Sequence, residues 1–179
     1  MPLASFLSRL TPLGRVALGF AVASVVMLIL MGGRPRFTNA AQPRGGWPAA
    51  LAIQFAGSVQ DVDLILGDAP SPDREVMRFK LYLDFVFIPI YTGLLVTLSW
   101  LAMRRGRWPK LAAGAAIVCA AGASVFDVAE NLATLQIVNT PLQATSQAMI
   151  DLVTVTSDAK WISAGVAIAF LLVSRYGRF

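Results

Sequence analysis

Residues 16–33 read VALGFAVASVVMLILMGG, an apolar stretch without a single charge. Residues 85–103 form a second uncharged stretch of similar length, FVFIPIYTGLLVTLSWLAM. A helix needs about 20 residues to cross about 30 Å of hydrocarbon, because each residue adds about 1.5 Å. Both stretches are long enough, so each is predicted to span a membrane.

Two further apolar runs reach this length only if a few charged residues enter the membrane. Residues 111–126 are rich in alanine and glycine, and residues 161–174 follow a mostly apolar segment. The chain is 14% charged, whereas a soluble domain carries about 25%. Its mean hydropathy of +0.66 also indicates a lipid environment. We therefore predict an all-α polytopic membrane protein, a four-transmembrane-helix bundle forming one domain over residues 1–179, with spans at about 13–33, 80–103, 110–138 and 153–175.

Short amphipathic helices are predicted in the outer loop at 34–79. The first covers residues 48–56 and ends at Gly57. Ser58 is predicted to cap the second, with an acidic residue three positions later, and Gly67 to end it. Their apolar side chains predict that both helices lie on the bundle or on the membrane surface.

Two Ser/Thr–Pro pairs carry the signal for a helix start. Ser71 precedes a proline, and we expect the helix of the second span to begin there. Thr140 also precedes a proline, within the outer segment 139–158. An amphipathic helix over residues 142–155 is predicted to follow and to lead into the fourth span.

The basic residues predict the orientation in the membrane. Segment 139–158 has no Lys or Arg, whereas the opposite ends of the spans carry basic residues without acidic neighbours: Arg9, Arg15, Arg104, Arg105, Arg107, Lys110, Arg175 and Arg178. The positive-inside rule predicts that both chain ends are cytoplasmic. Topology explains the net charge of +5, so membrane lipids and not nucleic acid are the expected partners.

The first apolar stretch has an alternative interpretation as a cleavable signal peptide. Its basic start and the sequence Thr38-Asn39-Ala40 before Ala41 resemble such a signal. Arginines at 34 and 36 are unfavourable so close to a cleavage site. An uncleaved membrane anchor is therefore the preferred prediction.

Histidine is absent and Cys119 is the one cysteine. An intramolecular disulfide, bis-His haem, a His-ligated zinc hydrolase site and Ser-His-Asp catalysis are thereby excluded. A carboxylate metal site stays open, but no spacing calls for one. We predict no cofactor and no metal.

Ionisable residues from three predicted spans reach a similar depth. Counted from the inner boundary, Asp127 lies about 25 Å and Lys160 about 22 Å into the membrane. Asp84 and Glu130 lie at about 30 Å, level with the outer interface, and Tyr91 at about 20 Å. Because a buried charge is costly unless it is paired, we expect these side chains to face inward. We expect Lys160 to pair with Asp127.

Helical spacing places these residues on shared faces. Asp127, Glu130 and Asn131 are related by i, i+3 and i+4, so they lie on one side of the third span. Ser124 and Thr134 extend the same face. Asp84 and Tyr91 are seven positions apart and share a face of the second span. Two interpretations remain open: a structural ion-pair cluster that fixes helix order, or an outward-opening pocket for a headgroup, a proton or a substrate. The ligand-binding candidates are Asp84, Tyr91, Asp127, Glu130, Asn131 and Lys160.

The segments LDFVFIPIY at 83–91 and FDVAENL at 126–132 resemble motifs of a widespread group of small bacterial four-helix membrane proteins without an assigned function. Members carry LDF…Y on the second span, D..EN on the third and a lysine on the fourth, here Lys160. The resemblance implies that the six candidates form one unit and that the protein lies in a bacterial inner (plasma) membrane, and it implies no activity. In architecture alone the chain is more distantly similar to the EXPERA-domain proteins, whose isomerase histidine it lacks.

We predict a non-enzymatic protein that binds a lipid-like ligand or docks as an accessory or assembly subunit on a larger membrane complex. The chain offers no redox ligand and no recognisable nucleophile, so no catalytic residue is assigned. The alternative is an enzyme acting on a lipid-soluble substrate, with Asp127 or Glu130 as general acid/base and Lys160 tuning them. Tyr91 would then orient the substrate. Ion transport is disfavoured because the inner halves of the spans are almost purely apolar.

Overall fold

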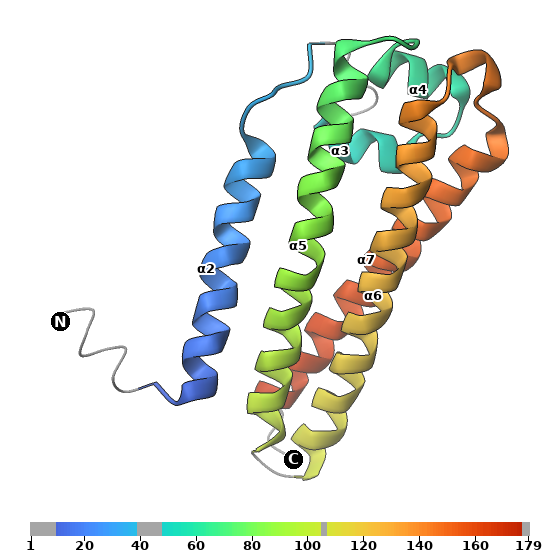
Figure 1. Ribbon diagram of the computed structural model, residues 1–179. Coiled ribbons are helices and arrows are strands. Elements are labelled where there is room, and N and C mark those ends of the chain that lie inside the picture. Colours follow the sequence, from blue (N-terminus) through green and yellow to red (C-terminus); the bar gives the residue numbers. More distant parts are fainter. Residues whose placement is uncertain (1–9, 39–47, 105–106, 177–179) are drawn as a thin grey trace.

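The computed structural model describes residues 10–38, 48–104 and 107–176, and these ranges are helical without any strand. Four helices are long and apolar enough to cross a membrane (Figure 1). They are α2 (Pro12–Gly32), α5 (Pro72–Met103), α6 (Arg107–Asn139) and α7 (Gln147–Tyr176). The protein is therefore an all-α polytopic membrane bundle, as predicted from the apolar runs.

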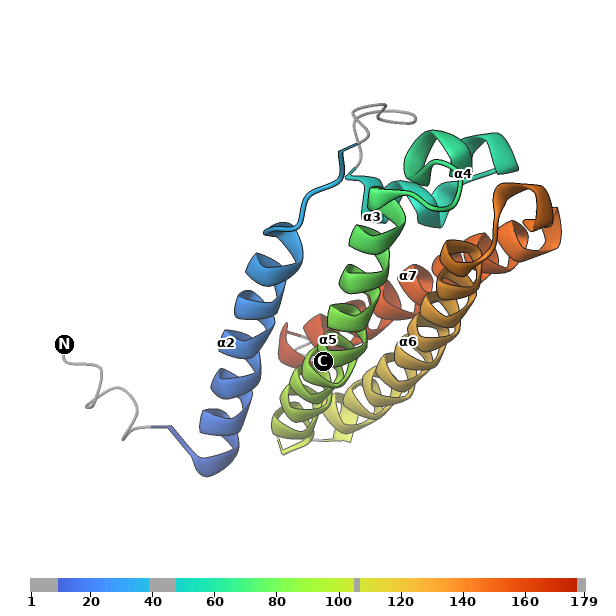
Figure 2. The same cartoon turned by 45° about the horizontal axis from the view of Figure 1, so that its top comes forward.

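The four long helices do not all pack against one another to the same extent. Helices α5, α6 and α7 lie together, with the most extensive contact between α6 and α7. Helix α2 packs along α5 and has hardly any contact with α6 or α7, as both cartoon views show (Figures 1 and 2). Consequently α2 leaves the α7 side of the bundle uncovered.

Small residues bring α6 close to its neighbours. Ala113, Ala116, Ala120 and Ala123 are all at most 2% exposed and recur at helical spacing on one face of α6. Lipid tails are as apolar as these side chains, so burial alone does not drive helix association within a membrane. Close van der Waals packing along this alanine face supports the contacts of α6 instead.

Two contacts attach α2 to α5. The ring of Phe20 lies against Gly93, and the backbone carbonyls of Met31 and Gly33 at the end of α2 accept hydrogen bonds from Lys80 Nζ, at 2.5 and 3.1 Å. Lys80 therefore satisfies carbonyls that the helix end leaves without an intrahelical partner. The Phe20 ring attaches the middle of α2 to α5, and the Lys80 ammonium attaches the end of α2 to α5.

Substitution of Gly93 by alanine is expected to loosen α2. The added Cβ would lie 2.6 Å from a ring carbon of Phe20, so the ring or the helix must move. Overpacking of this kind costs about 1–3 kcal/mol of unfolding free energy, which can be measured in lipid nanodiscs. Adding Phe20→Ala in the same chain should recover part of the loss. Gly165→Ala on α7 is the control, because its Cβ would meet nothing within 4 Å; an equal loss there would contradict the Phe20 contact.

At the end where α5 begins, short helices cover the bundle. They are α3 (Ala49–Ala52), η1 (Ile53–Phe55), α4 (Val59–Leu66) and η2 (Leu142–Ala144). The predicted helix at 48–56 is thus an α-helical turn followed by a 3₁₀ turn. The cap of the second helix is confirmed, since Ser58 Oγ accepts from the Asp61 amide at 3.2 Å. Gly67 ends this helix with φ 69°, a left-handed conformation that favours glycine.

One predicted helix is wrong in part. Residues 142–155 were expected to form a single helix after Pro141, but η2 ends at Ala144 and α7 begins at Gln147. Thr145 adopts an extended conformation between them. Ser146 supplies a second cap, since its Oγ accepts from the Met149 amide at 3.4 Å. The helix therefore starts later than expected and continues unbroken through the predicted fourth span.

An apolar core lies beneath these short helices, at the end of the bundle where α5 begins. Its fully buried side chains come from α4, α5, α6 and α7. They include Val62 and Leu66 of α4, Met77 of α5, Ile137 of α6 and Ile150 of α7. This core joins the short helices to the ends of the long ones, and water-excluding contacts of this kind stabilise a fold.

Asp68 joins the α4 end to the α6–α7 connection. Its carboxylate accepts hydrogen bonds from the Leu142 amide, the Gln143 side chain and the Ala69 amide, at 2.8–3.0 Å. The bond from Leu142, followed by those from Gln143 and Ala69, lowers the pKa of Asp68 below its ordinary value. The carboxylate is therefore ionised at neutral pH and holds the two loops together.

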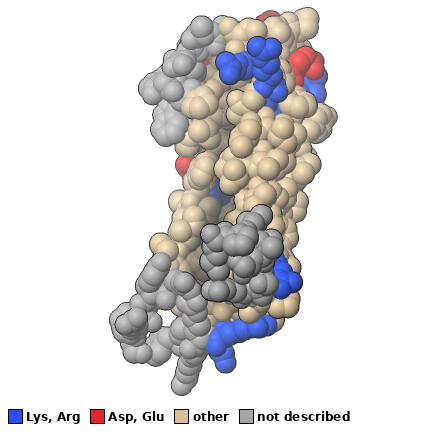
Figure 3. All heavy atoms as spheres, turned by 90° about the vertical axis from the view of Figure 1, so that its left-hand side faces the viewer, with Lys and Arg blue, Asp and Glu red and all other residues tan. Residues whose placement is uncertain are grey.

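Charge is concentrated at the two ends of the molecule. Seen from the α2 side, an almost uncharged belt separates charged side chains at the α4 end from basic ones at the α5–α6 turn (Figure 3). Such a belt is what the hydrocarbon requires. The Ala40–Ala41 junction, Arg9, Arg105 and Arg178, used in the sequence predictions, lie outside the described residues.

Candidate functional site

Helix α6 carries a row of buried polar side chains. Asp127 is 5% exposed, Glu130 2%, Asn131 1% and Thr134 0%. Their spacing of i, i+3, i+4 and i+7 places them on one helix face, as the sequence predicted. This face is the centre of the candidate site, because both α5 and α7 contact it.

Lys160 of α7 lies between two carboxylates of this row. Its Nζ is 3.2 Å from Asp127 Oδ1 and in direct contact with Glu130 Oε2. The predicted Asp127–Lys160 pair is therefore confirmed, and Glu130 is a second partner. Lys160 is itself only 7% exposed, so all three charges are removed from solvent.

Helix α5 contributes two hydrogen bonds to the same face. Asn131 Nδ2 donates to Asp84 Oδ2 at 2.8 Å, and the Tyr91 hydroxyl donates to Asp127 Oδ2 at 2.9 Å. Helix periodicity brings both α5 side chains to one side, seven residues apart. The structure thus brings all six predicted residues together at the junction of α5, α6 and α7. We name this set of six residues the charge cluster.

Further polar residues border the charge cluster, and Ser124 among them was predicted from its place on the same face of α6. Thr92 Oγ1 and Ser124 Oγ are 2.5 Å apart, and a hydrogen bond joins them just below Tyr91 and Asp127. Ser157 is fully buried, one helical turn before Lys160 and beside Glu130. Trp161 lies over the Lys160 ammonium, with 5.2 Å between Nζ and the ring centroid. Ser157 was not predicted, although its i, i+3 relation to Lys160 could have indicated it.

Exposure divides the charge cluster into an inner and an outer part. Asp127, Glu130, Asn131 and Lys160 are buried, whereas Asp84 and Tyr91 are half-buried. The inner part is held by direct ion pairs and so contributes to helix packing. The outer part, on α5, is less completely covered by the described residues.

The charges of the charge cluster do not balance. Three carboxylates face one ammonium, so two negative charges are in excess when all four groups are ionised. An excess charge in a region of low dielectric must be compensated by a proton, a cation or strong hydrogen-bond donors. Within the described part of the chain, no group of three or more His, Cys, Asp or Glu side chains could hold a metal ion.

Comparison of the chain with models of protein families, with curated proteins and with solved structures finds no match. The resemblances drawn from the two sequence motifs therefore stay predictions. What is established is the class, a multi-pass membrane bundle with four candidate spans and a buried polar cluster.

Proposed function

We propose that this protein binds a lipid-like molecule in the outer half of a bacterial inner membrane and catalyses no reaction on it. The polar head of the ligand would contact Asp84 and Tyr91, and its apolar chain would lie along the α7 side of the bundle. In this orientation both chain ends are cytoplasmic. The basic residues at the α5–α6 turn, among them Arg104 and Lys110, support that topology through the positive-inside rule.

The excess of carboxylates carries the proposal. Lys160 compensates Asp127 and Glu130 by direct contact, but Asp84 has only the Asn131 amide among its described partners. A half-buried carboxylate at this depth is better stabilised by a further donor. We therefore infer a ligand head that carries positive charge or donates hydrogen bonds, such as an amine.

Access from the lipid supports the same proposal. Helix α2 packs mainly on α5, so among the described helices it adds little cover to the α7 side next to the charge cluster. In the view from the α2 side, a hollow in the uncharged belt exposes part of a basic side chain (Figure 3). A lipid-dissolved molecule can enter by such a lateral opening without first crossing the short helices at the α4 end.

Matched amphiphiles test this proposal. The protein in zwitterionic nanodiscs is titrated with an alkyl amine, an alkyl alcohol and an alkyl carboxylate of equal chain length, and binding is followed by tryptophan fluorescence. We expect the amine to bind most tightly and the carboxylate most weakly. Asp84→Asn should weaken amine binding about tenfold, because one charge-assisted hydrogen bond is lost. It should leave the binding of the alcohol nearly unchanged.

The control is Asp151→Asn, which removes an exposed carboxylate near the start of α7. This variant should bind all three amphiphiles as the wild type does. Binding with no preference among the headgroups, or equal amine affinity in Asp84→Asn and wild type, would contradict a role of the charge cluster in ligand recognition. If no amphiphile binds at all, the cluster is a structural ion-pair network.

A further inference from the structure

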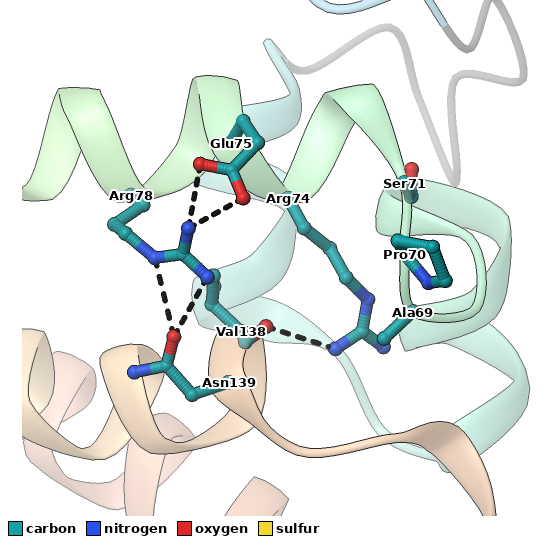
Figure 4. Close-up of a pocket in the computed structure, with 8 residues that line it drawn as sticks. All are labelled: Ala69, Pro70, Ser71, Arg74, Glu75, Arg78, Val138 and Asn139. Atoms are coloured by element: carbon teal, nitrogen blue, oxygen red, sulfur yellow. Dashed lines mark hydrogen bonds and ion pairs between the residues drawn. The ribbon is translucent and has the colours of Figure 1, made fainter.

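A second polar site lies away from the charge cluster, where α5 begins and α6 ends. A pocket of about 290 Å³ opens there. Arg74 and Ser71 lie on one side of it, and Glu75, Arg78 and Asn139 on the other (Figure 4). Its volume is at the lower end of the range for small-molecule pockets, so it suits a headgroup or a small ion and not a whole lipid.

Arg74 is a buried cation without an ion-pair partner among the described residues. It is 2% exposed, and its Nε and Nη1 donate to carbonyl oxygens of the α4 end and the α6 end. Its third nitrogen, Nη2, is buried without a hydrogen-bond partner in the described structure. The acids Asp63 and Asp68 act on it only at longer range. Buried charges are normally paired, so this guanidinium lacks an anion.

Arg78 is the second cation of the pocket, and an internal carboxylate holds it. It makes an ion pair with Glu75, which is 69% exposed, and donates to Asn139 Oδ1 at 2.8 Å. The lining therefore holds two guanidinium groups and one carboxylate, a net charge of one positive unit. Because Glu75 is largely exposed, an incoming anion can displace it from Arg78.

The position of the pocket along α5 places it outside the hydrocarbon. Helix α5 has 32 residues and a length of about 48 Å, well beyond the roughly 30 Å of hydrocarbon. Arg74 and Arg78 lie in its first two turns, near the positive end of the helix dipole. Counted from Arg104 at about 1.5 Å per residue, both lie beyond the hydrocarbon, where a lipid headgroup or a dissolved anion can reach them.

We propose that this pocket binds an oxyanion, a phosphate or a carboxylate, between Arg74 and Arg78. The anion comes either from a lipid headgroup or from solution. Arginine suits this role because its planar donors match the oxygens of both groups. Ser71 at the pocket wall adds a hydroxyl. This site is independent of the amphiphile site proposed above.

The test uses the full chain in nanodiscs, with thermal unfolding as the readout. In the first arm, phosphatidylcholine discs are titrated with inorganic phosphate at constant ionic strength. In the second arm, phosphatidylglycerol replaces part of the phosphatidylcholine. We expect saturable stabilisation in at least one arm, with about tenfold weaker apparent affinity in Arg78→Gln. Glu75→Gln should bind more tightly than wild type, because it removes the competing carboxylate.

Arg104→Gln, at the opposite end of α5, is the control for a general effect of positive charge. An effect of phosphate alone identifies a soluble anion, and an effect of phosphatidylglycerol alone identifies a headgroup; either supports the site. Stabilisation that is the same in wild type, Arg78→Gln and Arg104→Gln would overturn it, as would no stabilisation in both arms. Arg78→Gln leaves the hydrogen bonds of Arg74 in place, so a folding defect does not obscure the result.

Discussion

Replacement of Lys160 by methionine is expected to lower the free energy of unfolding by about 3–5 kcal/mol, the cost typical of breaking a buried ion pair from one side. Methionine keeps much of the length and apolar stem of lysine, so the loss comes from the charge. Asp127 and Glu130 are then left without the ammonium that contacts both of them. The unfolding free energy can be measured in nanodiscs or by denaturation in mixed detergent.

A second substitution separates electrostatics from packing. If the uncompensated carboxylates cause the loss, then Lys160→Met combined with Glu130→Gln should be more stable than Lys160→Met alone. The double-mutant cycle should give a coupling of at least about 1 kcal/mol, as expected for residues in contact. Additive losses would mean that the two side chains act separately, which contradicts the observed contact.

Lys110→Met is the matched control. Lys110 is exposed at the start of α6, so its loss should change the unfolding free energy by less than about 0.5 kcal/mol. Equal losses in the two variants would mean that lysine removal is harmful irrespective of position. If Lys160→Met were as stable as the wild type, the charge cluster would not hold the helices together. The interpretation of the cluster as a structural ion-pair network would then be wrong.

The convergence of the charge cluster could be predicted because two simple measures agreed. Depth, counted along each span, placed Asp127 and Lys160 at nearly the same level, and periodicity placed Asp127, Glu130 and Asn131 on one face. Membrane burial adds a strong constraint, since unpaired charges are excluded from lipid. The second partner of Lys160 was not predicted. Glu130 lies about 4.5 Å higher along α6 than Asp127, and the long lysine side chain spans that difference.

The place of α2 in the bundle could not be predicted. After Arg15 its residues are almost all apolar on every side, and its buried ones, Ala17, Ser24 and Met27, have no special pattern in the sequence. An evenly apolar helix carries no signal for the face that meets its neighbour. The contact of Phe20 with Gly93 depends on a missing side chain on α5, which becomes informative only when the two helices are seen together.

The predicted start of the fourth long helix was wrong for a local reason. Pro141 and Ser146 both carry start signals within a few residues, and the sequence alone does not rank them. The structure uses both, the first for η2 and the second for α7. Tertiary contacts distinguish them, because the short turn lets Asp68 bind the Leu142 amide across the loop.

Arg74 was not singled out because its partners are backbone carbonyls, which every sequence provides. We expect Arg74→Met to lower the free energy of unfolding by several kcal/mol. Nη1 donates to the carbonyls of Ile137, Val138 and Thr140, and Nε to that of Gly67. Each acceptor left buried without a partner costs about 1–3 kcal/mol.

The location of the damage distinguishes this prediction from general destabilisation. Hydrogen exchange should accelerate first in α4 and in the last turn of α6, which Arg74 joins, and not near the charge cluster. Arg74→Lys should be intermediate, because an ammonium retains the charge but lacks the planar fork that reaches both segments. Arg78→Met, which removes a more exposed charge one turn away, should cost less than about 1 kcal/mol. Equal stability of Arg74→Met and Arg78→Met would mean that the carbonyl groups had found other donors. The connection between α4 and α6 would then depend on Asp68 and the apolar core and not on Arg74.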